Sequence, residues 1–422
     1  MRSGVIAALA WGREWQWGYY KHPPMSAWLV ELARVGPHDW SLYVLAQLMV
    51  GLAWVAAWLL GRDLVGARLS TFGLMALEGI HYFNASSTEF NANMVMFPFW
   101  AWATLSFWRA LRTGSTAWWL AAGLFCGLGT LGKYVFLLLP ASVFLYTLAH
   151  PQARSQWRTP GPWAAMLVFA ALVSPHLLWA QQHDWATLQY AIGRGHSDEL
   201  TQQGSWLHEF LNFVLAQVLT LLPIWGLLRL LGPAAPTNRP SSERWLLFAL
   251  GMGPVLLIML AATLAQAKML QMWASPFYLC AAPLWLAWRQ PQQLNEGRFT
   301  KAWLAWVTLM GLLYVGSNLL GPQSKHHLDR TSYPDEEIAT ELTARWRAQT
   351  SQALHIVAGE EFVAGVVAHY SGDRPSVFYD ADFSESLWLS PQDVNDKGAL
   401  FVWPIGRGDT NMTAPPADSR EQ

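Results

Sequence analysis

The stretch Ser41–Leu60, "SLYVLAQLMVGLAWVAAWLL", contains no charged residue over 20 positions. A helix needs roughly 20 such residues to cross the hydrocarbon core of a bilayer. The rest of the chain has a similar character, because 53% of its 422 residues are hydrophobic and only 13% are charged. A soluble domain carries roughly 25% charged residues. The composition therefore predicts a polytopic membrane protein.

Further apolar runs follow this stretch and predict an all-α bundle of about ten transmembrane helices. The candidate spans are residues 41–60, 66–85, 94–111, 117–131, 135–149, 162–181, 208–232, 244–266, 269–288 and 302–320. The 27 tryptophans fit the enrichment of this residue at membrane interfaces. The net charge of −1 gives no basic field that would attract nucleic acid. Cys126 and Cys280 both lie in apolar runs, which suggests neither a disulfide framework nor a cysteine metal site.

Lysines and arginines in the short loops predict the orientation of the bundle, because such residues collect on the cytoplasmic side. Five loops share most of the basic residues, which are Arg62, Arg68, Arg109, Arg112, Arg154, Arg158, Arg239, Arg244, Arg289, Arg298 and Lys301. These loops are expected to face the cytoplasm. The N-terminal residues and the C-terminal region then both face outward.

The composition becomes polar after Gly321, which predicts a domain boundary there. In all, four regions are expected. They are a first outward loop with interfacial helices, a transmembrane domain, a small α/β extracytoplasmic module and a disordered tail, at residues 1–40, 41–321, 322–408 and 409–422. The module is predicted from a helical pattern at 334–348 and from the strand-like runs "LHIVAG" and "GALFVW".

The first outward loop contains an unusual group, Lys21-His22-Pro23-Pro24, just before an apolar helical pattern. Proline is tolerated in the first turn of a helix, so the pair predicts a helix over about 24–35. The free N–H groups at such a start favour an anion. Two interpretations stay open: an interfacial anchor with a snorkelling lysine, or a phosphate site at the membrane surface.

Other outward segments also carry polar residues at bilayer depth or at its edge, and an unpaired charge there is costly. The run 84–94 contains Glu89, Asn91 and Asn93, and Lys133 lies between two short apolar runs. The end of the span at 162–181 adds further groups, namely His176, His183, Asp184, Tyr190, Arg194 and His196, and Lys268 lies in an outward hairpin. Each residue alone can be ordinary interfacial decoration. Together, the cations could neutralise a lipid-linked phosphate.

These segments resemble the GT-C class of membrane glycosyltransferases, in the branch of glycosyltransferase 39 and protein-O-mannosyltransferase-like enzymes. Within this branch they resemble lipopolysaccharide galacturonosyltransferase-like proteins and the aminoarabinose transferases of lipid A. Four segments carry the resemblance in the expected order: "GYYKHPPMSAWL" (18–29), "STEFNANMVMFPFWAWA" (87–103), "GLFCGLGTLGKYVFLLL" (123–139) and "SPHLLWAQQHDWATLQYA" (174–191).

The resemblance implies inverting transfer of a sugar from a polyprenyl-phosphate donor to lipopolysaccharide, lipid A or another cell-envelope glycan, on the outer face of the bacterial inner membrane. It implies a donor phosphate site at Tyr20, Lys21, His22, Lys133, Arg194 and Lys268. It places the carboxylate base at Glu89 or Glu14, and acceptor or sugar contacts at Asn91, Asn93, His176 and Tyr190. A divalent metal ion assists some members, so a metal is an open expectation, although the histidines lack a tight ligand spacing.

The chain departs from the family pattern in two places. Members begin with a further span and an acidic residue before the double proline, whereas here Glu14 is the only carboxylate before Lys21. The sequence is therefore expected to be truncated at its N-terminus. Asn91 also stands where many members have an acid.

Two other functions stay open at this stage. A transporter or flippase of a lipid-linked saccharide could use the same cations. Its binding groups would be expected near the membrane midplane, whereas here they crowd one face. A catalytically inactive, truncated member of the family is the remaining reading.

Overall fold

The structure is a computed structural model, and it describes residues 3–35, 40–88, 90–193, 206–265, 267, 269–320 and 333–404. Its contacts divide the chain into two compact units, Met1–Tyr333 and Pro334–Gln422. The boundary expected at residue 321 falls outside the described residues.

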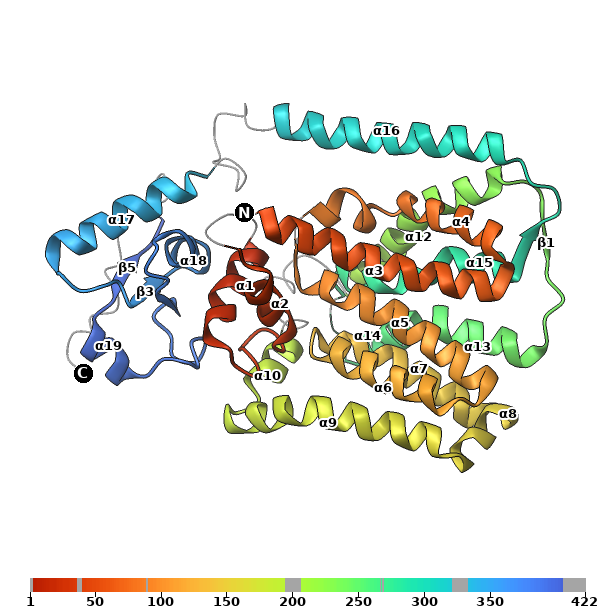
Figure 1. Cartoon of the computed structure of the whole chain (residues 1–422), viewed down its shortest axis with the longest axis horizontal. Coiled ribbons are helices and arrows are strands. Elements are labelled where there is room, and N and C mark those ends of the chain that lie inside the picture. The colour runs from red at the N-terminus through yellow and green to blue at the C-terminus, as the bar shows by residue number, and fades with distance from the viewer. Residues whose placement is uncertain are drawn as a thin grey trace. The chain divides into compact units, whose positions relative to one another are not determined.

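The first unit is a bundle of helices that run alongside one another (Figure 1). Its α-helices are α1 (Ser3–Glu14), α2 (Met25–Ala33), α3 (Trp40–Val65), α4 (Ala67–Ala76), α5 (Ala92–Thr113), α6 (Thr116–Thr130), α7 (Leu138–Ala149), α8 (Pro151–Arg154), α9 (Pro160–Gln182), α10 (Ala186–Gly193), α12 (Trp206–Leu230), α13 (Ser241–Gly251), α14 (Gly253–Ala265), α15 (Ala281–Trp288) and α16 (Glu296–Leu320). Its 3₁₀ helices are η1 (Leu77–Gly79), η2 (His81–Phe83), η3 (Ala85–Thr88), η4 (Tyr134–Leu137), η5 (Ser155–Arg158) and η6 (Gln271–Cys280).

All ten candidate spans coincide with helical segments of this unit. Within the described residues, four single helices are long and apolar enough to cross a membrane, namely α3, α9, most of α12 and most of α16. The number rises to six if the bent pairs, η4–α7 with α8–η5 and α13 with α14, each count as one span. Other expected spans form helices too short to meet this criterion, such as α6 with 15 residues. The protein is a multi-pass membrane protein with the predicted all-α bundle.

One expected span, 66–85, is not a single helix, because α4 ends at Ala76 and three 3₁₀ turns follow. The backbone approaches α12 closely at this point. A Cβ atom on Gly79 would lie only 2.8 Å from the backbone nitrogen of Ile224. The side chain of Asn84 donates a 2.6 Å hydrogen bond to the carbonyl of Glu78, which satisfies a group that the broken helix leaves open. The polar residues 84–88 therefore form compact turns instead of continuing α4.

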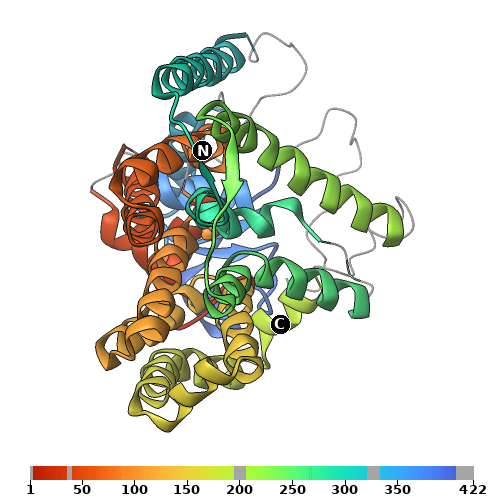
Figure 2. The same ribbon diagram turned by 90° about the vertical axis from the view of Figure 1, so that its right-hand side faces the viewer.

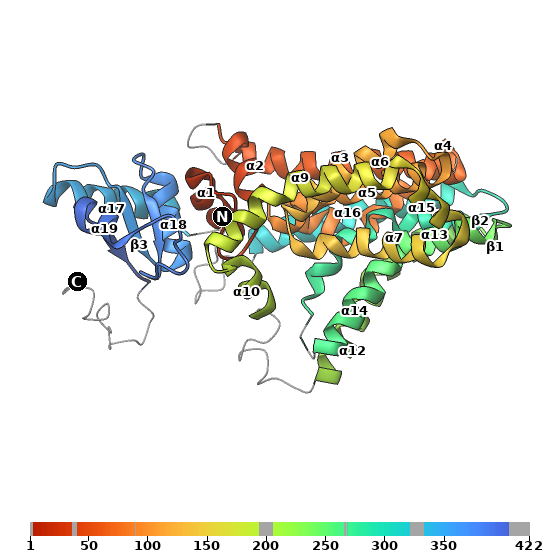
Figure 3. The same cartoon turned by 90° about the horizontal axis from the view of Figure 1, so that it is seen from below.

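The apolar exterior of the unit agrees with a lipid environment. The α16 window that meets the span criteria is only 6% buried, and the corresponding window of α12 is 28% buried. Figure 2 shows α16 at the edge of the unit, and Figure 3 shows α12 and α14 extending away from the other helices. Contiguous exposed leucines of this extent mark a membrane-facing surface in a folded protein.

The basic loops come together at one end of the bundle. Arg109 forms a 2.6 Å ion pair with Asp63, and Glu243 pairs with both Arg112 (3.4 Å) and Arg239 (3.0 Å). The strands β1 (Ala234–Pro236) and β2 (Arg289–Pro291) pair antiparallel at the same end, opposite to α1, α2 and α10 (Figure 1). Loops that share the predicted cytoplasmic charge therefore share one end of the structure.

The second unit is a small α/β fold around a three-stranded parallel sheet of order β4-β3-β5. Its elements are α17 (Asp335–Gln349), β3 (Ile356–Gly359), α18 (Glu361–Tyr370), β4 (Ser376–Tyr379), α19 (Pro391–Lys397) and β5 (Leu400–Val402). Residue 356 pairs with 376, and residue 357 pairs with both 377 and 400. Ile356, Ala358 and Phe378 form its core, as expected for a central strand covered on both faces.

Candidate active site

Within the expected first outward loop, the segment between α1 and α2, residues 15–24, is the first loop of the structure. It lies at the end of the bundle opposite to the basic loops. α1 ends at Glu14, and a tight turn closes with a 3.0 Å hydrogen bond from the Tyr19 N–H to the His22 carbonyl. The double proline then leads into α2 at Met25. The Met25 N–H donates a 3.0 Å bond to the carbonyl of Leu131, which joins the start of α2 to the end of α6.

Lys21, His22 and Lys133 gather at this junction. The charges of Lys133 and Lys21 both act on the His22 ring, so the three groups are neighbours in space although Lys133 is distant in sequence. His22 is largely surrounded by protein, and its ring centroid lies 6.0 Å from that of the buried Trp11. Desolvation lowers the pKa of His22 to about 3, and the charges of Lys133 and Lys21 add to this effect.

Lys133 is positioned by a break between two helices. Its backbone is extended where α6 has ended and η4 begins, so Lys133 lies at a helix end rather than within a helix. Its ammonium donates a 2.8 Å hydrogen bond to the side-chain oxygen of Asn93 on the first turn of α5. The charge that the sequence placed between two apolar runs therefore has a polar partner.

Asn91 has a local structural task. Its side-chain oxygen accepts hydrogen bonds from the backbone N–H groups of Asn93 (2.9 Å) and Met94 (3.3 Å), which makes it the N-cap of α5. Asparagine and aspartate cap helices about equally well. The departure at Asn91 therefore keeps the cap while removing a negative charge from the loop.

The loop rests on α9 and α10. His176 is fully buried, and its two ring nitrogens contact the Trp17 carbonyl (2.7 Å) and the Tyr134 hydroxyl (2.6 Å). Farther along, the ring of Tyr190 on α10 meets that of Tyr20 edge to face at 5.8 Å. Lys21 in turn lies over the Tyr20 ring, with 4.9 Å from its nitrogen to the ring centroid.

The structure thus brings together eight of the twelve predicted site residues around one end of the bundle, which are Tyr20, Lys21, His22, Asn91, Asn93, Lys133, His176 and Tyr190. Glu14 ends α1 and lies 3.8 Å from Arg13 in an ion pair, and its charge acts on Tyr19. The remaining three predicted residues, Glu89, Arg194 and Lys268, fall outside the described residues.

Sequence reasoning missed several members of this neighbourhood. Tyr134, Trp11 and Thr187 all contact the first loop or the predicted site residues, but each is apolar or singly polar and stands in an ordinary helical pattern. The adjacency of Tyr134 to Lys133 was the only available signal. The other contacts depend on how α1 and α10 pack.

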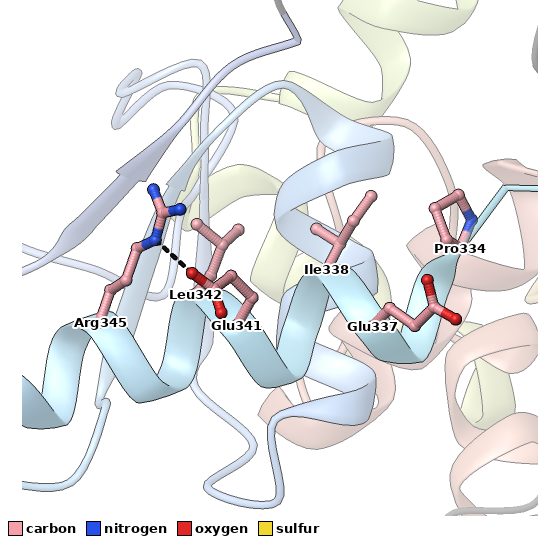
Figure 4. Close-up of a pocket in the computed structure, with 6 residues that line it drawn as sticks. All are labelled: Pro334, Glu337, Ile338, Glu341, Leu342 and Arg345. Atoms are coloured by element: carbon pink, nitrogen blue, oxygen red, sulfur yellow. Dashed lines mark hydrogen bonds and ion pairs between the residues drawn. The ribbon is translucent and has the colours of Figure 1, made fainter.

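A metal centre finds no support in the described residues, because no three histidine, cysteine, aspartate or glutamate side chains among them lie close enough to hold an ion. The second unit contains a hollow of about 320 Å³ along α17, lined by Pro334, Glu337, Ile338, Glu341, Leu342 and Arg345 (Figure 4). It is an open helix face with one exposed Arg345–Glu341 ion pair, and none of the predicted site residues lines it.

Comparison with known proteins agrees with the motifs. Residues 21–179 match the family model of the dolichyl-phosphate-mannose-protein mannosyltransferases. The chain is 29% identical to the lipid A galacturonosyltransferase RgtD of Rhizobium johnstonii over 293 residues, which cover 65% of this chain and 58% of RgtD. It is 24% identical to the lipopolysaccharide core galacturonosyltransferase RgtB of the same organism, over 95% of this chain and 82% of RgtB. The match to RgtD thus spans less than two thirds of that relative.

Solved structures show the same architecture. The crystal structure of ArnT from Cupriavidus metallidurans bound to undecaprenyl phosphate superposes with a TM-score of 0.55 at 17% identity, over 93% of this chain and 74% of ArnT. The apo form of ArnT gives a TM-score of 0.54. The resemblance is confirmed, and the chain has the helical fold of the GT-C membrane glycosyltransferases.

Proposed function

We propose that this protein is a membrane glycosyltransferase that moves a sugar from a polyprenyl-phosphate donor onto a lipopolysaccharide, lipid A or other cell-envelope acceptor. We place the reaction on the periplasmic face of the bacterial inner membrane. The observation that carries the proposal is the grouping of Lys21, His22 and Lys133 at the end of the bundle opposite to the basic loops. The named relatives act on lipid A and on the lipopolysaccharide core, and ArnT was solved with undecaprenyl phosphate.

The proposed reaction is a single displacement at the anomeric carbon of the donor sugar. The acceptor hydroxyl oxygen forms the new bond to that carbon, and the bond between the carbon and the phosphate oxygen breaks. The electron pair leaves with the polyprenyl phosphate, while the acceptor proton passes to a carboxylate. Glu89 and Glu14 are the candidate bases.

The cations are proposed to stabilise the leaving phosphate. Lys21 and Lys133 supply positive charge, and preorganised groups of this kind can each be worth roughly 10²–10³ in rate. His22 is uncharged at neutral pH, given its lowered pKa, so its part is a hydrogen bond. Tyr20, Arg194 and Lys268 are proposed as further donor contacts, and Asn91, Asn93 and Tyr190 as groups facing the acceptor or the sugar. His176, for which the same contact was expected, is fully buried with both ring nitrogens bonded within the protein.

The test uses membranes that contain the full chain and polyprenyl-phosphate sugars carrying a radiolabel. Label is expected to move onto an envelope glycolipid, and Lys21→Ala, His22→Ala and Lys133→Ala should abolish the transfer with expression intact. Lys301→Ala is the matched control, because this exposed lysine lies at the start of α16 among the basic loops and should leave the rate unchanged. Full transfer by all three site variants would refute the assignment.

The same experiment separates a transferase from a flippase. A flippase would move the intact labelled donor between leaflets of sealed vesicles without attaching its sugar to an acceptor. An inactive chain would do neither.

A further inference from the structure

Three residues of the first loop are each held by a different group of the α9–α10 segment. The side chain of Gln16 accepts a 3.0 Å hydrogen bond from the Trp179 indole N–H, and the Trp17 carbonyl bonds to His176. Two residues farther, the Tyr19 carbonyl accepts a 2.6 Å hydrogen bond from the fully buried hydroxyl of Thr187. The segment therefore determines the path of the loop that carries Lys21 and His22.

Gly18 shows how tightly the loop lies on this support. A Cβ atom at residue 18 would fall 2.3 Å from the Trp179 ring and 3.0 Å from Nδ1 of His176. The rings of His176, Trp179 and His183 stack along one face of α9, with 6.2 Å and 4.3 Å between successive centroids. Only a residue without a side chain lets the backbone lie against this stack.

His176 differs from the other supports because it has a second bond outside the loop. The Trp17 carbonyl can only accept, so Nδ1 of His176 carries a hydrogen. Nε2 of the neutral ring then accepts from the hydroxyl of Tyr134, which immediately follows Lys133 in the chain. One imidazole ring therefore connects the loop of Lys21 and His22 to the helix break of Lys133.

We infer that His176 is a positioning residue, which sets the spacing between the Lys21–His22 loop and Lys133 through its bonds to the Trp17 carbonyl and the Tyr134 hydroxyl. This inference rests on the proposed function. Because both ring nitrogens are already engaged within the protein, His176 acts on the substrate through the residues that it places. The side chains of the proposed donor site come from separate elements, since Lys21 and His22 lie in the first loop and Lys133 lies between α6 and η4. A shift of about 1 Å in such a group can lower the rate roughly 10²-fold.

Two substitutions can each remove the bond between His176 and Tyr134 while keeping the bond to the Trp17 carbonyl. In His176→Asn, the side-chain amide can still donate to the Trp17 carbonyl but is too short to reach Tyr134. Tyr134→Phe removes the hydroxyl and keeps the ring. Both variants break the same link, so each should raise the KM for the polyprenyl-phosphate sugar by about tenfold, and the double variant should be no worse than either single one.

The matched control is His183→Asn. His183 lies two turns farther along the chain at the end of α9, and among the described residues its Nδ1 bonds to the Trp179 carbonyl of its own helix, at 2.7 Å. This variant should leave the KM unchanged. Loss of folded protein would lower the apparent kcat without raising the KM, so the KM readout separates positioning from a general loss of structure.

Binding of undecaprenyl phosphate to the purified full chain, measured by its effect on the thermal unfolding midpoint, gives a readout independent of transfer. A wild-type protein that neither transfers sugar nor gains stability from this lipid would refute the proposed function itself. If the wild-type protein does both, the proposed function stands. The positioning role of His176 would then be refuted if His176→Asn and Tyr134→Phe keep the wild-type KM, or if the effects of the two substitutions on KM add.

Discussion

The surrounding protein strongly controls the charge of His22. Its pKa falls from 6.5 to about 3 because of desolvation, with the charges of Lys133 and Lys21 next in importance. The unfolded chain therefore binds a proton at pH values where the folded protein does not. His22 should therefore leave the free energy of unfolding unaffected above about pH 6.5, and should lower it progressively as the pH falls toward 3.

Replacing His22 by glutamine tests this electrostatic account. At pH 5 the histidine should cost the wild-type protein about 2 kcal/mol relative to its stability at pH 7.5. His22→Gln has no titrating group at this position, so its unfolding midpoint in detergent should fall less between these two pH values. A decrease equal to that of wild type would show that His22 is charged in the folded state.

At the same scale, the sequence predicted the cations better than their partners. Lys21, His22 and Lys133 were singled out because charge at membrane depth needs a reason, and they do gather. Asn91 carried the signature of an N-cap directly before an apolar helix, which could have been recognised. The bonds of His176 could not, because they depend on where α6 ends relative to α9, and no local pattern specifies that.

Among the elements, α6 and α9 approach each other closely at two glycines. A Cβ atom on Gly123 of α6 would lie 2.3 Å from the backbone oxygen of Ala165 on α9, and one on Gly161 would lie 2.2 Å from the Trp119 ring. Small residues at such crossings allow the backbones of membrane helices to pack directly. This packing fixes α9, and therefore the support of the first loop.

Gly123→Ala should separate these two helices. The new methyl group meets backbone atoms that cannot rotate away, so the variant should lose about 1–3 kcal/mol of stability. The unfolding midpoint in detergent measures the effect. Gly226→Ala on α12 is the control, since nothing lies within 4 Å of its added Cβ, and it should be neutral or slightly stabilising.

The second unit offers a separate element, α19, with a defined cap. The Ser390 hydroxyl and the Asp393 carboxylate close a capping box, and Lys397 donates a 2.6 Å hydrogen bond to the same carboxylate. These bonds lower the pKa of Asp393 from 3.8 to about 2. The carboxylate should therefore stabilise α19 fully above about pH 4, and this effect should disappear as the pH falls toward 2.

Asp393→Asn removes the charge while keeping the shape of the side chain. Amide hydrogens of α19 should exchange faster in the variant than in wild type at pH 7, and the difference should diminish below pH 4. The measurement is hydrogen exchange of the full chain, read at the peptides that cover 391–397. Equal protection of these peptides at pH 7 would show that the carboxylate does not stabilise the helix.

The sequence predicted helices at all ten apolar runs, but not where they break. Hydropathy averages over about 20 residues, so it does not resolve the 3₁₀ turns that end α4 or the one at Gln271–Cys280. Those breaks follow from tertiary contacts such as the approach of Gly79 to α12. The breaks matter for function, since Lys133 and the turns before Asn91 both lie in them.

For the whole molecule, the main asymmetry is between the two ends of the first unit. The end with β1 and β2 collects arginines and their ion pairs, whereas the opposite end carries Lys21, His22 and Lys133 beside aromatic rings. Basic residues in short loops stay on the cytoplasmic side during insertion. The proposed donor site should then face the periplasm. Helix α9 connects this end of the unit to the basic end.

Helix α9 allows this orientation to be tested with matched positions. Its 23 residues span roughly 34 Å, enough to cross the bilayer core. Arg158 is exposed just before the helix at the basic end, and Trp185 is 42% exposed just after it. The native Cys126 and Cys280 are both buried, so the wild-type chain gives a low background for thiol labelling.

A membrane-impermeant maleimide should therefore label Trp185→Cys in intact spheroplasts, and should label Arg158→Cys only after the membrane is permeabilised. The physical reason is that charge distribution fixes which end of α9 crosses the membrane during insertion. Labelling of Arg158→Cys alone from outside would invert the orientation and move the cation group to the cytoplasm. Labelling of both positions from outside would show that α9 does not cross the bilayer, and a periplasmic donor site would then lose its basis.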